Sequence, residues 1–385
     1  MTEPYKGREQ TEAKHIILRC YLQTLTFKLL EGGLRELAYV DGFSGPWESR
    51  TTDFSDTSFM IAIGVLKDAH QKFRDKGVPK TVKCFFVEEN PTSYKQLAAA
   101  VAKHHDPTNG FHIATFQGRF EDAVSEIIKF VGRAFALVFI DPTGWTGYPY
   151  HTIAPVLRHQ PSEVLINFMY DHINRFAAST DPTIVETLDP ILGGPKWAER
   201  LDPDLPRGLA VEKLFRSVLK TEGDFKHVLS TRIDKSTADR PHFFIAYGTR
   251  SDHGLKAFRE IEHAALKGHE KRRVEAKQQK KTDRTGMVDL FSGQPMPEEN
   301  TLEELVDGIR KTATVWARAY LSDVGPIKFD DLCAAMLQLF MLRVTDAKDI
   351  CVALAGEGAI VDTWSADNKR KPHDHHQIGL ISQAT

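Results

Sequence analysis

The chain has 385 residues, of which 41% are hydrophobic and 26% are charged, and its net charge is −2. These values exclude wholesale disorder and a globally basic nucleic-acid-binding protein, and the length predicts about two to three domains. The longest apolar run, Phe59–Leu66, is much shorter than the about 20 residues of a membrane-spanning helix. No apolar secretory region opens the chain, and its four cysteines are far apart, which together favour a cytoplasmic protein.

Apolar patterning predicts alternating helices and strands over the first two thirds of the chain. The expected helices are Lys14–Leu30, Thr57–Lys67, Ser93–Lys103 and Glu121–Val131. The expected strands are Leu34–Val40, Val82–Val87, Phe111–Phe116, Phe135–Ile140 and Glu163–Met169. The strongest strands are continuously apolar, which predicts a Rossmann-like α/β fold with a parallel sheet and helices on both faces. Phe225–Ile233 and Phe243–Ala246 complete the sheet, with an antiparallel edge as one arrangement.

A charged segment separates this region from the C-terminal part. Lys267–Arg284 holds eight basic and three acidic residues and predicts a helix end that leads into a linker. A capping box at Thr301 and Glu304 then starts a helix, and two short helices and a hairpin follow, which is the order of a winged helix-turn-helix. The predicted domains are 1–265 and 301–385, joined by 266–300. The domain 301–385 carries nine basic and 12 acidic residues, which favours a protein partner over DNA.

Polar and glycine residues follow the predicted strands where open α/β sheets bind ligands. The first strand runs into a glycine turn over Asp41–Gly45, and the second strand ends at Glu88. The glycines permit close approach of a ligand, and a carboxylate at the second strand end can bind ribose hydroxyls. The structural alternatives are a plain strand-to-helix turn and an acid at a helix start.

The fourth strand delivers Asp141 and Pro142 to a loop, and Trp145 follows. A carboxylate at the end of an apolar strand needs a partner, such as a substrate amine, and Trp145 can stack on a planar substrate. The alternative is a turn-capping Asp and a core Trp. After the fifth strand, Tyr170, Asn174 and Arg175 are expected to contact substrate, although a charged helix start explains them as well.

Other catalytic and metal patterns are absent from the sequence. It contains no P-loop and no Gly-x-Ser-x-Gly nucleophile elbow. No metal site is expected, because the 16 histidines form no ligand pattern. His373, His375 and His376 are interpreted as the solvated tip of the C-terminal hairpin, which spans Ala359–Thr363 and Gln377–Ser382.

Several of these segments together resemble the three-Cys-motif partner proteins, TcmP. The resemblance lies in Lys14–Leu22, YVDGFSGP (Tyr39–Pro46), FFVEEN (Phe85–Asn90), FIDPTGW (Phe139–Trp145), EVLINFMYDHINRF (Glu163–Phe176) and, more loosely, Phe243–Phe258. It implies a class I S-adenosylmethionine-dependent methyltransferase fold with a C-terminal winged-helix domain. It also implies a three-Cys-motif protein as the partner. The family's cysteines belong to that partner.

The resemblance also assigns site residues. It implies that the cofactor is held by Asp41, Gly42, Phe43, Ser44, Gly45, Glu88, Phe120 and Glu121. Asp141 and Pro142 correspond to the Asp-Pro motif of amino-methyltransferases, in which a target amine donates to the Asp and the Pro carbonyl. The sequence departs from the family at Trp47, where a glycine is usual, and at Thr57-Ser58-Phe59, where Gly-Ser-Pro is usual.

Two functions follow as hypotheses. The first is an active methyltransferase on the amino group of a nucleic-acid base or a related planar substrate. Lys267–Lys281 and Lys369–Lys371 would then hold phosphates. The second is a catalytically degenerate module of the same fold that acts through a protein partner, which the substitution at Trp47 favours. Neither hypothesis involves a membrane or a metal.

Overall fold

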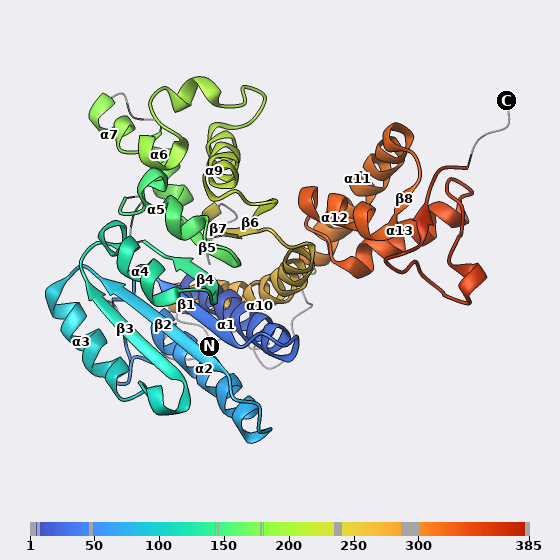
Figure 1. Cartoon of the computed structure of the whole chain (residues 1–385). Coiled ribbons are helices and arrows are strands. Elements are labelled where there is room, and N and C mark those ends of the chain that lie inside the picture. The colour runs from blue at the N-terminus through green and yellow to red at the C-terminus, as the bar shows by residue number, and fades with distance from the viewer. Residues whose placement is uncertain are drawn as a thin grey trace. The chain divides into compact units, whose positions relative to one another are not determined.

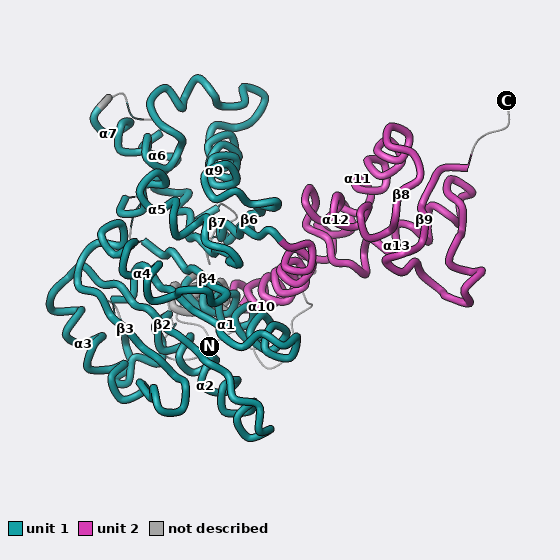
Figure 2. Tube along the Cα trace, viewed as in Figure 1, with its two compact units in different colours: residues 1–250, 275–277 teal, residues 251–274, 278–385 magenta. Residues whose placement is uncertain are grey.

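A computed structural model of the chain describes residues 5, 8–45, 49–142, 144, 146–177, 179, 181–234, 241–285 and 301–381. The chain divides into two compact units, which Figure 2 distinguishes by colour. The first comprises Met1–Arg250 and Glu275–Lys277, and the second comprises Ser251–Val274 and Gln278–Thr385. The helix that precedes the expected linker therefore belongs mostly to the second unit.

The first unit is built on one seven-stranded sheet with the order β3-β2-β1-β4-β5-β7-β6. Its strands are β1 Glu36–Asp41, β2 Thr81–Glu88, β3 Phe111–Gln117, β4 Phe135–Ile140, β5 Ser162–Phe168, β6 His227–Asp234 and β7 Pro241–Thr249. The pairs among β1 to β5 are parallel, whereas β7 runs antiparallel to both β5 and β6. A mainly parallel sheet whose strands alternate with helices confirms the predicted Rossmann-like α/β fold (Figure 1). The edge position belongs to β6, and the antiparallel strand lies inside the sheet.

Helices cover both faces of this sheet. One face carries α1 Glu9–Glu31, α2 Ser58–Asp75 and α3 Pro91–Ala102, and the other carries α4 Val124–Val131, α5 Tyr150–Leu157 and α9 Arg207–Gly223. Three short helices lie between β5 and α9, namely α6 Tyr170–Phe176, α7 Pro182–Glu186 and α8 Asp189–Leu192. The 3-10 turns of this unit are η2 Pro107–Asn109, η3 Phe120–Ala123 and η4 Trp197–Arg200.

The core lies on both faces of the sheet. Every residue of β4 and β5 is buried, which explains why β4 is apolar throughout. β5 also buries the polar Ser162, Glu163 and Asn167. On one face the rings of Tyr39 and Phe86 lie 6.2 Å apart, and Phe59 of α2 packs against Phe86. On the other face Phe168 of β5 packs against Phe215 of α9, with ring centroids 4.3 Å apart.

The second unit consists of helices and one small sheet. Its elements are α10 Asp252–Thr285, α11 Thr301–Val324, β8 Ile327–Lys328, α12 Phe329–Leu339, α13 Val344–Gly356, η5 Ser365–Asp367 and β9 Gln377–Ile378. The two helices expected after the capping box are present as α12 and α13. β9 pairs antiparallel with β8, and the expected first strand of the hairpin contributes only the bridge from Ile360 to Leu380. The strand stops there because Asp362 accepts a hydrogen bond from the Ser365 backbone N–H and forms a turn.

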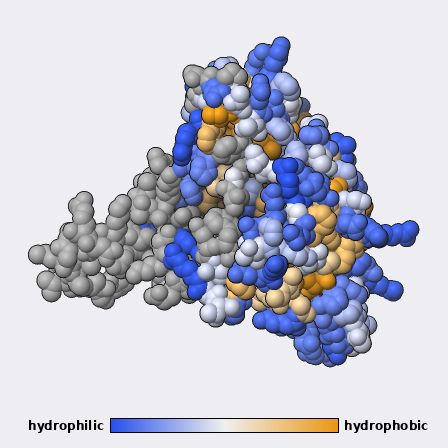
Figure 3. Space-filling model, turned by 90° about the vertical axis from the view of Figure 1, so that its left-hand side faces the viewer, coloured by the Kyte–Doolittle hydropathy of each residue, from blue (hydrophilic) through white to orange (hydrophobic). Residues whose placement is uncertain are grey.

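The longest apolar run is part of the core. It lies in α2, where Phe59, Ile63 and Leu66 are buried against the sheet. In the described part of the chain, no helix combines the length and the apolar character needed to span a membrane. On the face that Figure 3 shows, hydrophilic side chains predominate and hydrophobic ones gather in separate patches.

Candidate functional site

The turn after β1 is organised by a buried carboxylate. Asp41 is fully buried, and its Oδ1 accepts a hydrogen bond from the Phe43 backbone N–H at 3.1 Å. Its Oδ2 accepts from Ser58 Oγ, at the start of α2, at 2.8 Å. Burial raises the pKa of Asp41 to about 6, although these donors oppose the shift. Asp41 therefore shapes the turn from inside, while Phe43 and Gly45 are its partly exposed residues.

Ser44 attaches the turn to the sheet. Its hydroxyl donates to the Asp41 carbonyl oxygen at 2.9 Å, and its backbone N–H donates to the Val87 carbonyl oxygen at 2.8 Å. Gly42 donates its backbone N–H to the Phe139 carbonyl oxygen at 3.0 Å. The turn is thus held between the carboxyl ends of β1, β2 and β4, where the sequence predicted a ligand site.

Two glycines in the turn permit contacts that a side chain would block. A Cβ on Gly45 would lie 2.0 Å from Glu88 Oε2, and a Cβ on Gly42 would lie 2.9 Å from the Phe120 ring. Neither glycine has a positive φ, so close approach explains these glycines better than backbone conformation does. The structure therefore brings together Gly42, Gly45, Glu88 and Phe120, which the sequence placed in separate segments.

Glu88 lies at the end of β2 with one oxygen available. Its Oε1 accepts a hydrogen bond from the Asn90 backbone N–H at 2.7 Å, and among the described residues no donor reaches Oε2. Half-burial raises the pKa of this carboxyl. The Asn90 side chain caps α3 by accepting from the N–H groups of Thr92 and Ser93 at 2.9 and 3.0 Å. Glu88 is therefore not the cap of the next helix, and Glu89 is exposed.

Aromatic rings surround the turn. Phe43 packs against Phe120 with ring centroids 5.9 Å apart, and against Tyr148 at 6.5 Å. Tyr148 is fully buried, and in the described part of the chain its hydroxyl has no hydrogen-bond partner. The sequence analysis missed Tyr148, although it lies in the loop after β4. Glu121 forms an ion pair with Arg119 at 2.7 Å beside this cluster.

Asp141, at the end of β4, already has two partners. Lys14 Nζ of α1 lies 2.5 Å from Asp141 Oδ2, and Asn167 Nδ2 of β5 donates to Oδ1 at 2.7 Å. Pro142 is buried beside it. The sequence analysis missed both partners of Asp141. The available signal was a cation in a helix predicted to be buried, because such a cation requires an anion.

Asn167 supports this position from β5. The side chain is 2% exposed, and its buried Oδ1 has no hydrogen-bond partner within the described ranges. An acceptor without a donor in a buried place is costly, which is typical of a site that a ligand completes. Trp145, predicted to stack on substrate, lies outside the described residues, as does Trp47.

The three residues expected at the rim are not joined to this cluster. The Tyr170 ring packs against Phe244 at 5.2 Å, and its hydroxyl fills the space above Gly208, where a Cβ would lie 2.1 Å away. Asn174 is half-exposed and Arg175 is exposed. Across the described residues, no hydrogen bond or ion pair connects Tyr170, Asn174 or Arg175 to Asp141. Tyr170 thus has a packing role between α6, α9 and β7.

The strand order and the turn at its centre define a Rossmann-like α/β unit. No protein-family model matches the chain, and no curated protein matches it. Among solved structures, the chain is similar to loganic acid methyltransferase with SAH, at 9% sequence identity. The match covers 74% of this chain and 92% of that chain, with a TM-score of 0.28. Because that score is low, the fold assignment rests on the strand order of the sheet.

Proposed function

We propose that this chain is an S-adenosylmethionine-dependent methyltransferase that acts on the amino group of a nucleic-acid base or a related planar substrate. One observation carries the proposal: Glu88 Oε2 lies against Gly45 at the carboxyl ends of β1 and β2. A carboxylate oxygen without a donor, next to a backbone without side chains, is the arrangement that binds the two hydroxyls of a ribose.

The residues present fit this cofactor. Glu88 would accept from the ribose, and Gly42 and Gly45 would allow the nucleoside to approach the backbone. The rings of Phe43 and Phe120 offer apolar faces next to the turn. Asp41 acts on the cofactor only through the turn, since its oxygens bond within the protein. When bound, the cofactor supplies an electrophilic methyl group.

Asp141 is the residue that we propose binds the methyl-accepting amine. An amine that donates to its carboxylate and to the Pro142 carbonyl would be oriented for methylation, so the contribution of these groups is positioning. A substrate amine would compete with Lys14 for Oδ2. The ion pair with Lys14 favours the ionised carboxylate, which can accept a hydrogen bond from an amine. Asn167 Nδ2 donates to the other oxygen, Oδ1.

The proposal includes a protein partner and a nucleic-acid substrate. The helices α11 to α13 and the short strands β8 and β9 support a winged-helix domain. We propose, from the family resemblance, that it contacts a three-Cys-motif protein. Nucleic acid would be held by Lys267–Lys281 and by Lys369–Lys371. All three cations of the second cluster are exposed, and Lys371 forms an ion pair with Asp349. A cytoplasmic location is part of the same proposal.

A second candidate is a degenerate methyltransferase-fold module that acts by binding a protein. The Lys14 ion pair favours it, because the ammonium group occupies the carboxylate that a substrate amine needs. The excess of acidic residues in 301–385 also favours a protein partner over nucleic acid. In this case the turn at Asp41 is a structural remnant of the fold.

Calorimetric titration with S-adenosylmethionine tests the proposal. The wild type is expected to bind, and Glu88→Ala is expected to weaken binding by about tenfold or more, since a hydrogen bond to a charged group is worth about 1.5–3 kcal/mol. Glu89→Ala is the matched control, because this neighbouring acid is exposed and lies outside the turn. It should bind as the wild type does. Thermal unfolding of each variant shows whether it is folded.

Two results would contradict the proposal in different ways. A folded wild type that does not bind the cofactor would leave the binding module as the function. Equal affinity in the wild type and Glu88→Ala would show that the cofactor, if bound, does not use the carboxyl end of β2. With binding established, transfer of a labelled methyl group to nucleic acid, lost in Asp141→Asn, identifies the acceptor class.

A further inference from the structure

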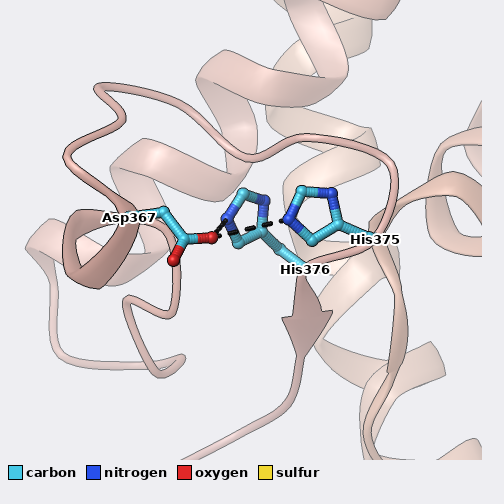
Figure 4. A group of neighbouring side chains, drawn as sticks. All are labelled: Asp367, His375 and His376. Carbon is cyan, nitrogen blue, oxygen red and sulfur yellow. Dashed lines mark hydrogen bonds and ion pairs between the residues drawn. The ribbon is translucent and has the colours of Figure 1, made fainter.

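Three potential metal ligands meet in the second unit. They are Asp367, the last residue of η5, and His375 and His376, which directly precede β9 (Figure 4). One ligand atom from each lies within 4.8 Å of the others. The sequence analysis interpreted the histidines as a solvated loop because it did not foresee that Asp367 returns to them.

The distances between these atoms fit a tetrahedral ion. His376 Nε2 lies 3.0 Å from Asp367 Oδ2, and His375 Nε2 lies 3.5 Å from the same oxygen. Ligands at about 2.0–2.1 Å from a tetrahedral Zn²⁺ are separated by about 3.3 Å. Both separations from Asp367 Oδ2 are close to that value, and all three ligand atoms lie within 4.8 Å of one another.

Two of the three side chains are held by the surrounding loop. His376 is 4% exposed, and its Nδ1 accepts from the His373 backbone N–H at 2.7 Å. Asp362 bonds the backbone N–H groups of Trp364 and Ser365, which fixes the turn that ends at Asp367. A preformed arrangement of this kind reduces the entropy that a ligand must overcome.

The His376 ring can serve a metal without a change in its charge. In the metal-free chain, the proton on Nε2 is donated to Asp367. A metal on Nε2 displaces that proton, and the neutral ring carries its proton on Nδ1 instead. The His373 carbonyl oxygen, 3.2 Å from Nδ1, then accepts that proton, and the His373 N–H gives up the contact with Nδ1 that it makes in the metal-free chain. A backbone carbonyl on the second ring nitrogen is the usual support of a metal-bound histidine.

A simple His–Asp hydrogen bond explains less of the geometry. One hydrogen bond needs only His376, yet His375 aims its Nε2 at the same carboxylate oxygen. Its side chain is 71% exposed, so burial does not explain its position. The two rings are stacked with centroids 4.3 Å apart. Two imidazoles that converge on one carboxylate are a common ligand set for Zn²⁺.

We propose that Asp367, His375 and His376 bind a divalent transition metal ion, Zn²⁺ by the type of ligands. The three protein ligands leave a fourth position for water. Because the ligands lie at the two ends of the segment 367–376, the ion would clip this loop to the start of β9. The proposal is independent of the methyltransferase function, since all three residues belong to the second unit.

The test is a titration of the full-length, metal-free chain, prepared without a histidine tag, with Zn²⁺ and with Co²⁺. We expect one equivalent of metal to bind and the Co²⁺ form to show the visible absorption of a tetrahedral site. His375→Gln is expected to weaken binding by about tenfold or more. It is the first variant to make because the exposed side chain can be replaced without loss of packing. Asp367→Asn should act in the same direction.

His373→Gln is the matched control. This histidine is exposed in the same loop, and it contacts His376 only through its backbone groups and ring edge. It should bind metal as the wild type does. No binding by the wild type, or unchanged affinity in His375→Gln, would overturn the proposal. Loss of binding in His105→Gln/His112→Gln, whose rings lie 6.4 Å apart elsewhere in the chain, would assign the metal to another place.

Discussion

At the scale of single residues, Asp41 shows how one buried carboxylate shapes a site without facing it. It is fully buried, and its donors come from the turn and from the start of α2. The ionised form satisfies those donors but lacks water, and burial is the larger effect on its pKa. Folding therefore makes this carboxyl harder to ionise.

This shift makes stability depend on pH. The folded pKa of Asp41 is about 6 and its unfolded value is 3.8. Between these values the folded state holds a proton that the unfolded state has released. The free energy of unfolding therefore falls as pH rises through this window, by about 3 kcal/mol in total. Asp41→Asn cannot ionise, so the stability of this variant relative to the wild type should increase with pH.

Urea unfolding of both proteins at about pH 4 and about pH 7 measures this difference, in which the other carboxyls cancel. The amide of the variant still offers an oxygen to the Phe43 N–H, so the turn can persist. A difference between variant and wild type that stays constant with pH would show that Asp41 titrates alike in the folded and unfolded states.

The site could be predicted from the sequence only in part. The glycine turn and Glu88 were predicted because each follows a strand of a parallel sheet, and such ends meet at one edge. Phe120 was implied by the family resemblance. Lys14 and Asn167 were missed as partners of Asp141, since neither is near it in the chain. The packing role of Tyr170 was missed because it depends on the space above Gly208, in a helix that the sequence analysis did not place.

At the scale of elements, a buried hydrogen-bond network attaches α1 to the sheet. Tyr21 of α1 is fully buried and donates its hydroxyl to Glu163 of β5. Its oxygen also lies 2.6 Å from the Tyr247 hydroxyl of β7. Thr249 Oγ1 donates to the other oxygen of Glu163 at 2.8 Å. Burial raises the pKa of Glu163, so this carboxylate depends on its donors.

Tyr21→Phe removes one donor from that buried carboxylate and should destabilise the protein by about 1–3 kcal/mol. Tyr94→Phe is the matched control, because its hydroxyl bonds Thr115 Oγ1 at 3.1 Å in a partly exposed place. It should cost about 1 kcal/mol or less. Urea unfolding midpoints at neutral pH compare the two variants. Equal losses would mean that the network does not determine how α1 docks.

The elements themselves were largely predictable, with instructive exceptions. β4 matches its expected range because a fully buried strand is apolar throughout. α2 begins close to its expected start, where Thr57 caps it, but the helix continues to Asp75. The polar second half was not recognised as helical, although Ala69 and Phe73 recur at helical spacing and are buried. A few apolar residues among many charged ones give a weak helical pattern in the sequence. Their burial is still enough to pack this half of α2 in the folded state.

At the scale of the whole molecule, the chain folds as two compact units with separate cores. The second unit has a buried ionic centre at Asp346, which is 1% exposed. Arg310 Nε and Arg343 Nε each donate to it at 3.0 Å. These guanidinium groups lower the pKa of Asp346 to about 2, against the effect of its burial.

Two units with separate cores should unfold in two thermal transitions. Asp346→Ala removes the shared anion from two partly exposed arginines and should destabilise the second unit by about 2 kcal/mol. Differential scanning calorimetry should then show one transition at a lower temperature and the other unchanged. Tyr21→Phe should lower only the transition that Asp346→Ala leaves in place. One common transition that moves in both variants would contradict this division.

The sequence by itself determined the class of fold and the general place of the site. Continuous apolar strands, helical spacing between them and a glycine turn are local patterns, and local patterns are written along the chain. The tertiary structure decided that β7 lies between β5 and β6, that Lys14 pairs with Asp141, and that Asp367 meets two histidines. Each of these joins residues that are apart in the chain. Whether these residues come into contact depends on how whole elements pack, which a local sequence pattern does not determine.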